Sequence, residues 1–239
     1  DEDHAVPLHN YDATAGTLQI GLKSGSTSWP NRASNNDNKA AMQLALSPSV
    51  PLDLSLALGA TEAKIDLGGL TLRGLNLNSG AADLSIDFST PNRTRMATAT
   101  VNVGAASLTA DHLANANAGT LTVNGSIAPS VLTTVNAGGT LGGNGIVGST
   151  VINTGGVLVP GPMATPGTMT VIGNLAFQSG ALYVVQVNPT TASSSNVSGT
   201  ASLAGTVAAI FAPGSFLSRS YTILTAAGGR SGTFRSEEN

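Results

Sequence analysis

The feature that most constrains this chain is a long segment without charge, because residues 113–218 contain no Lys, Arg, Asp or Glu. Helices of soluble proteins expose such residues on their solvent-facing side, so this segment is poorly suited to form them. It is rich instead in Gly, Ser, Thr, Asn, Ala, Val and Leu, which suit extended strands and tight turns. We therefore predict an all-β fold.

The overall composition excludes several classes of protein. Charged residues make up 10% of the 239 residues, whereas an ordinary soluble domain contains about 25%. Ten cations beside thirteen anions do not provide the basic face of a nucleic-acid-binding protein, so no nucleic acid is expected as a partner. No stretch approaches the roughly 18 consecutive apolar residues of a membrane-spanning helix. Cysteine is absent, which excludes disulfides and thiolate metal ligands.

Internal repeats indicate how the strands are arranged. A phrase made of glycine, small residues and a short alternating strand begins at Gly59, Gly80 and Gly104. Periods of about 20 residues are typical of a β-solenoid, in which each coil buries its apolar side chains against the neighbouring coils. We therefore predict a β-solenoid, with a β-sandwich or barrel as the alternative. A looser phrase, with glycine two residues before an apolar residue, follows at Gly119, Gly139, Gly156, Gly167 and Gly180.

Asparagine is expected at the corners of the coils and in ladders between them. Asn and Gly tolerate left-handed backbone angles at low cost, and amide side chains keep a surface soluble without charge. The candidates are Asn76, Asn78, Asn124, Asn136, Asn144, Asn153 and Asn174.

Composition along the chain predicts four parts. Residues 1–40 form an N-terminal lead-in or cap, 41–118 charged solenoid repeats, 119–180 uncharged coils, and 181–239 a C-terminal cap. The last part is richer in aromatic residues, and a solenoid needs its final coil covered because an open coil exposes core and strand edges. Four of the nine aromatic residues lie after residue 200, namely Phe211, Phe216, Tyr221 and Phe234.

Residues from about 113 to 235 resemble the C-terminal passenger region of bacterial autotransporters, which use type V secretion. The resemblance implies a right-handed parallel β-helix at the cell surface or outside the cell. It also implies that the last coils act as an autochaperone and that an outer-membrane barrel follows in the parent protein. The motifs that carry it are Gly119-Thr-Leu-Thr-Val-Asn-Gly-Ser126, Val135-Asn-Ala-Gly-Gly-Thr-Leu-Gly-Gly-Asn-Gly145, Gly156-Val-Leu-Val-Pro-Gly161, Gly173-Asn-Leu-Ala-Phe177, Tyr221-Thr-Ile-Leu-Thr-Ala226 and Gly232-Thr-Phe234.

Residues from about 44 to 117 resemble a different family, the toast-rack β-solenoid of envelope-stress and cell-wall-antibiotic-response proteins. The resemblance implies a sensing or binding module with an anionic or amphiphilic ligand or a protein partner. Both families are β-solenoids, so the two halves either share one stack or form a fusion. The motifs are Pro51-Leu-Asp-Leu-Ser-Leu56, Glu62-Ala-Lys-Ile-Asp-Leu67, Leu70-Thr-Leu-Arg-Gly-Leu-Asn-Leu77 and Ala82-Asp-Leu-Ser-Ile-Asp-Phe88.

Two patterns that resemble ligand sites are better explained as structure. Gly143-Asn-Gly-Ile-Val-Gly148 fits a dinucleotide-binding pattern, but no helix is expected after it and the required acidic residue is missing. We therefore predict a solenoid turn there. His4, His9 and Asp12 include metal-binding residue types, but we interpret them as part of an acidic terminus. No catalytic residue, cofactor-binding residue or metal ligand is assigned, and no cofactor is expected.

The carboxylates are the remaining candidates for chemistry. Asp66 and Asp87 occupy equivalent repeat positions, so they are expected to stack one coil apart, at about 5 Å. Lys64 and Arg73 are expected to neutralise them, which favours a solvated stripe over a catalytic pair. His112, beside Asp111, is expected on an exposed turn. The full set of candidate carboxylates is Asp53, Glu62, Asp66, Asp83, Asp87 and Asp111.

These observations lead to one main hypothesis and two alternatives. The main hypothesis is a non-enzymatic, extracellular structural passenger segment of a bacterial protein, whose C-terminal coils serve as folding nucleus and cap. The first alternative is an envelope-stress or cell-wall-sensing, ligand-binding module. The second is a carbohydrate-active β-helix. Because the ends of a solenoid carry unpaired strand edges, end-to-end association with other copies of the chain is also expected.

Overall fold

The chain divides into two compact units, residues 1–46 and residues 47–239. In the first unit, β1 (Val6–Asp12) and β2 (Thr17–Lys23) form an antiparallel two-stranded sheet. The four-part division expected from composition stays a prediction. The computed structural model describes residues 6–12, 17–23, 44–59, 62–80, 83–104, 107–130, 132–162, 164–216 and 220–236.

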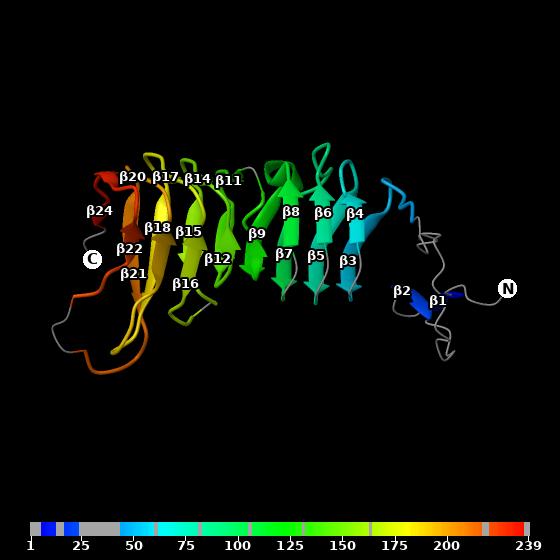
Figure 1. Ribbon diagram of the computed structural model, residues 1–239, viewed down its shortest axis with the longest axis horizontal. Helices are drawn as coiled ribbons and strands as arrows, with labels where there is room; N and C mark the ends of the chain where they lie inside the picture. The colour runs from blue at the N-terminus through cyan, green and yellow to red at the C-terminus, as the bar shows by residue number, and fades with distance from the viewer. Residues whose placement is uncertain are drawn as a thin grey trace, which may run out of the picture. The chain divides into compact units, whose positions relative to one another are not determined.

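The second unit is a β-solenoid, which confirms the predicted fold class. Its named strands pair in parallel, each with the equivalent strand of the next coil. One nine-stranded sheet runs the whole length of the unit (Figure 1). Its strands, in order along the stack, are β3 (Pro51–Leu58), β5 (Thr71–Ser79), β7 (Met96–Val103), β9 (Ala118–Asn124), β12 (Thr140–Gly143), β15 (Val157–Pro160), β18 (Leu182–Val187), β21 (Thr206–Phe211) and β24 (Arg235–Ser236).

The other sides of the coils change partway along the stack. The first coils add one sheet, of β4 (Glu62–Asp66), β6 (Asp83–Asp87) and β8 (Ser107–Asp111). Later coils add two five-stranded sheets. The first contains β10 (Ser126–Ile127), β13 (Ile146–Val147), β16 (Thr168–Val171), β19 (Ser194–Val197) and β22 (Leu224–Ala226). The second contains β11 (Thr133–Val135), β14 (Thr150–Ile152), β17 (Leu175–Phe177), β20 (Ala201–Leu203) and β23 (Arg230–Gly232).

A short 3₁₀ helix, η1 (Leu113–Ala116), lies where the coil shape changes. The residues at its two ends, His112 and Asn117, both have left-handed backbone angles, with φ of 50° and 51°. It is the only helix among the described residues. None of these residues forms a helix with the length and apolarity needed to span a bilayer.

Part of the core is a column of buried and half-buried, mainly apolar side chains at one register position of the long sheet. Because the side-chain period of a strand is two, every coil must keep the same register to bury this position. Burying each large side chain contributes about 1.5–3 kcal/mol. The column does not break where the uncharged segment begins. Its members are Leu54, Leu75, Ala99, Leu121, Leu141, Leu158, Tyr183 and Val207.

Hydroxyl and amide groups connect the uncharged coils at their surface. Asn153 Nδ2 donates to Asn136 Oδ1 at 2.9 Å, and Thr225 Oγ1 donates to Asn196 Oδ1 at 3.0 Å. Asn174 Oδ1 accepts hydrogen bonds from Thr200. Such bonds satisfy outward-facing polar groups without ions, which explains how this part of the chain can dispense with charge.

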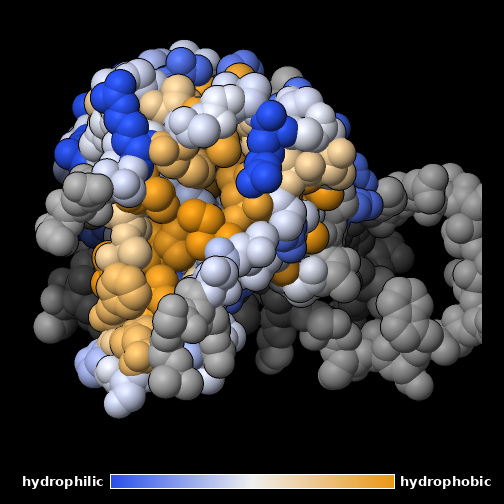
Figure 2. Space-filling view, turned by 90° about the vertical axis from the view of Figure 1, so that its left-hand side faces the viewer, coloured by the Kyte–Doolittle hydropathy of each residue, from blue (hydrophilic) through white to orange (hydrophobic). Residues whose placement is uncertain are grey.

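The C-terminal coils contain an aromatic cluster. The ring of Phe234 lies 5.0 Å from that of Phe177 and 5.5 Å from that of Tyr183, so Phe234 covers the end of the core. Phe211 and Phe216 instead contact each other, and both are exposed. Figure 2 views this end of the solenoid and shows hydrophobic surface surrounded by hydrophilic side chains.

Candidate functional site

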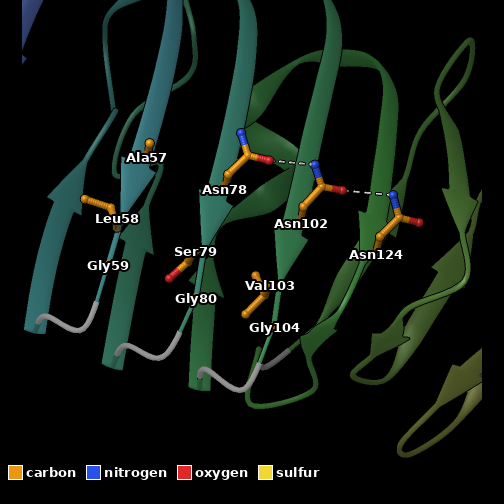
Figure 3. A pocket seen from close by; sticks show the side chains of 10 residues that line it. All are labelled: Ala57, Leu58, Gly59, Asn78, Ser79, Gly80, Asn102, Val103, Gly104 and Asn124. Carbon is orange, nitrogen blue, oxygen red and sulfur yellow. Dashed lines mark hydrogen bonds between the residues drawn. The ribbon is translucent and has the colours of Figure 1, made fainter.

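An open groove of about 580 Å³ runs across the first coils, where the long strands end and glycine turns follow (Figure 3). None of its lining residues is charged. The lining residues are Ala57, Leu58, Gly59, Asn78, Ser79, Gly80, Asn102, Val103, Gly104 and Asn124.

The repeated glycines shape the floor of this groove. Gly80 N–H donates to the carbonyl of Leu58 at 3.2 Å, and Gly104 N–H donates to that of Ser79 at 2.9 Å, so the turns follow one another coil by coil. A Cβ atom on Gly104 would lie 3.2 Å from the carbonyl oxygen of Gly80. The absence of side chains therefore leaves the backbone accessible at Gly59, Gly80 and Gly104.

An asparagine ladder forms one side of the groove. Asn78, Asn102 and Asn124 occupy one register position on β5, β7 and β9. Asn102 Nδ2 donates to Asn78 Oδ1 at 2.9 Å, and Asn124 Nδ2 donates to Asn102 Oδ1 at 3.0 Å (Figure 3). The ladder continues to the backbone N–H of Asn144, which lies 3.3 Å from Asn124 Oδ1. This confirms the expectation that asparagines form ladders between coils.

The ladder leaves hydrogen-bonding capacity for a ligand. A side-chain amide has two N–H donors and an oxygen with two lone pairs, and the ladder uses one donor and one lone pair of Asn102. The groove therefore offers a regular row of neutral donors and acceptors.

A row of acidic residues lies on the neighbouring sheet. Asp66 on β4 is in register with Asp87 on β6, which is in register with Asp111 on β8. The expected stacking of Asp66 and Asp87 one coil apart is confirmed. Glu62 and Asp83 form a second such pair on the same sheet.

Two of these carboxylates are occupied by local hydrogen bonds. The backbone N–H of Gly68 and the hydroxyl of Ser89 donate to Asp66, at 2.8 Å and 2.7 Å, and both bonds lower the pKa of Asp66. Asp87 Oδ1 lies 2.7 Å from Nδ1 of His112, whose pKa is raised first by that hydrogen bond and then by the charges of Asp87 and Asp111. His112 is exposed, as expected.

The prediction that Arg73 neutralises this row is wrong. A register shift between β3 and β5 makes Arg73 an extra residue in its strand, and its guanidinium pairs with Asp53 at 2.5 Å. Both side chains of this pair are well exposed, so the pair contributes little to stability. Lys64 is exposed on β4.

The other candidate patterns lie away from the groove. Gly143–Gly148 contains the end of β12, a two-residue connection and β13, and the next described element is a strand rather than a helix, which confirms the predicted turn. His4 lies outside the described residues, and so do the side chains of His9 and Asp12. Within the part of the chain that the structure describes, no group of three or more His, Cys, Asp or Glu is placed to hold a metal ion.

Two residues of the site area were missed by the sequence reasoning. Asn102 was not among the ladder candidates, although Asn78 and Asn102 both precede a repeat glycine by two residues. That shared spacing was a usable signal. The left-handed conformation of His112 had no comparable signal in the sequence.

Comparison with known proteins supports the toast-rack resemblance. A family model described as the N-terminal domain of toast_rack, DUF2154, matches residues 2–111, a little under half of the chain. This range includes β3 to β8 and most of the groove. The chain matches no curated protein and no solved structure. The toast-rack resemblance is therefore supported for the part of the chain that holds the groove.

Proposed function

We propose that this chain is a non-catalytic binding module of the bacterial cell envelope, which takes part in envelope-stress or cell-wall sensing. The toast_rack match to residues 2–111 and the β-solenoid fold support this proposal. The observation that carries it is the Asn78–Asn102–Asn124 ladder along an open groove.

The chemistry of the groove favours a neutral, hydroxyl-rich polymer such as a cell-wall glycan. Successive coils place equivalent amides about 4.8 Å apart, so a ligand with regularly spaced polar groups can meet them one after another. Sugar hydroxyls both donate and accept, as the amides do. Because no charged residue lines the groove, an anionic ligand gains no ion pair there.

Co-sedimentation of the full chain with purified insoluble cell-wall glycan tests this proposal. We expect the wild-type chain in the pellet and the Asn102→Leu variant largely in the supernatant. Asn153→Leu is the matched control, because Asn153 makes the same kind of inter-coil amide bond and does not line the groove. Equal sedimentation of wild type and Asn102→Leu would contradict the proposal.

A second candidate function is a structural passenger segment, exposed outside the cell, in which the C-terminal coils nucleate folding. The cluster of the buried Phe177 and Tyr183 with the half-buried Phe234 favours it, because it gives these coils the largest aromatic cluster among the described residues. The comparisons do not support a relationship to autotransporters. We also propose end-to-end contact between copies of this chain, because Ile210, Phe211 and Phe216 are large apolar residues that are exposed.

A further inference from the structure

A second, smaller hollow lies where the coils change shape and is partly open to solvent. Its volume is about 120 Å³, and it shares no lining residue with the asparagine groove. It lies beside η1, at the point where coils with two sheets give way to coils with three. Its walls are mainly apolar side chains, among them Leu75, Ile86, Phe88, Leu108, Leu121 and Leu141.

One buried hydroxyl in this cavity lacks a partner. Thr133 lines the cavity with 1% exposure, and its Oγ1 has no hydrogen-bond partner among the described residues. Thr150 occupies the same register position in the next coil, is equally buried, and donates from Oγ1 to the carbonyl of Gly148 at 2.9 Å. Unpaired buried polar groups are rare in native proteins, so the Thr133 hydroxyl is left with a donor that a polar ligand atom can satisfy.

A cation also lines the cavity. Arg95 is exposed, and its Nη2 donates to the carbonyl of Gly138 at 2.7 Å. A guanidinium has five N–H groups, so most of its donors stay available for a second partner. Guanidinium donors bind carboxylates through charge-assisted hydrogen bonds.

The geometry points to a binding site for a small amphiphilic anion, a short-chain aliphatic carboxylate. The aliphatic part of the ligand lies among the leucine side chains, and its carboxylate accepts hydrogen bonds from Arg95 and from the Thr133 hydroxyl. A dry cavity of about 150 Å³ with similar walls is large enough to hold benzene, so this cavity suits an apolar group of a few carbon atoms. This site stands independently of the proposed glycan groove.

Calorimetric titration of the full chain with hexanoate and with hexanol tests the proposal. We expect hexanoate to bind more tightly than hexanol. Arg95→Gln and Thr133→Val should each weaken hexanoate binding by roughly tenfold, whereas Thr150→Val should leave it unchanged. Ala110→Ile, which adds volume to the cavity wall, should abolish binding of both ligands. Circular dichroism verifies folding, and Ala99→Val replaces Ala110→Ile if that variant does not fold.

Several results would overturn the proposal. Absence of hexanoate binding by the wild-type chain would remove the site. Unchanged binding by a folded cavity-filling variant would place the ligand elsewhere. Equal affinity for hexanol and hexanoate, with no effect of Arg95→Gln, would contradict the recognition of an anionic head group at this site.

Discussion

The imidazole Nδ1 of His112 lies 2.7 Å from the carboxylate Oδ1 of Asp87, a residue 25 positions earlier in the chain. The contact exists because Asp87 and Asp111 share a register position, which places the residue after Asp111 beside the neighbouring coil. It links β6, the middle strand of the three-stranded sheet, to the residue that precedes η1.

This ion pair predicts a pH dependence. Asp87 and, more weakly, Asp111 raise the pKa of His112 above its ordinary value of 6.5. Protonated His112 therefore contributes stability that is fully present below the unfolded-state pKa and is lost as pH rises through the higher folded-state pKa. An NMR titration of the ring should show a midpoint above 6.5 in the wild type and a lower one in Asp87→Asn. An identical midpoint in both proteins would contradict the assignment.

Backbone geometry at the ends of the long strands predicts a contrast between two glycine substitutions. Gly125 has φ of 129°, and a Cβ atom there would lie 2.1 Å from the carbonyl oxygen of Val103. A Cβ atom on Gly59 would meet nothing within 4 Å. Gly125→Ala should therefore lower the free energy of unfolding by about 1–3 kcal/mol or more, and Gly59→Ala should change it by less than about 1 kcal/mol. Urea unfolding measures both, and equal effects would contradict the stacking of these turns.

The two equivalent threonines give a second matched pair. Thr150→Val leaves the carbonyl of Gly148 without its hydroxyl donor and should cost about 1–2 kcal/mol of stability. Thr133→Val removes a hydroxyl that has no described partner, so its effect should stay within about 0.5 kcal/mol or be stabilising. Thermal and urea unfolding without added ligand compare the two variants. A larger loss in Thr133→Val would show that its hydroxyl already has a partner in the protein.

Regular features of the fold could be predicted from the sequence because the repeats carry the register. Asp66 and Asp87 have the same place in two similar phrases, and parallel stacking turns equal places into neighbours. The absence of charge from residues 113–218 indicated strands for a different reason: hydroxyl and amide side chains suit the outer face of stacked coils.

The remaining features depend on exceptions to the repeat. Arg73 meets Asp53 because one extra residue shifts the register, and a single inserted residue is not visible in so loose a repeat. The cavity beside η1 depends on how side chains from coils of different shape fill a common interior. Neither spacing nor composition carries that information, so the unpaired Thr133 could be found only in the structure.

Removal of the C-terminal coils tests their role in folding. Deletion of residues 181–235 removes β18 to β23 and the first residue of β24, exposes the apolar side chains of Leu158 and Phe177 and leaves β15 with an unpaired edge. We expect the remainder to be unfolded or aggregated by circular dichroism and limited proteolysis. Deletion of residues 1–46, which form a separate unit, should leave the solenoid folded. A cooperative, protease-resistant fragment of residues 1–180 would contradict a nucleating role.

The dissociation constant for a soluble cell-wall glycan fragment tests the central claim most directly. Titration calorimetry should show saturable binding to the wild-type chain, a loss of roughly tenfold or more in Asn102→Leu, and wild-type affinity in Asn153→Leu. The loss is expected because Asn102 accepts from Asn124 and donates to Asn78, so its replacement interrupts the ladder at its centre. Absence of saturable binding to the wild type, or equal affinities of wild type and Asn102→Leu, would contradict the assignment of the groove as a glycan site.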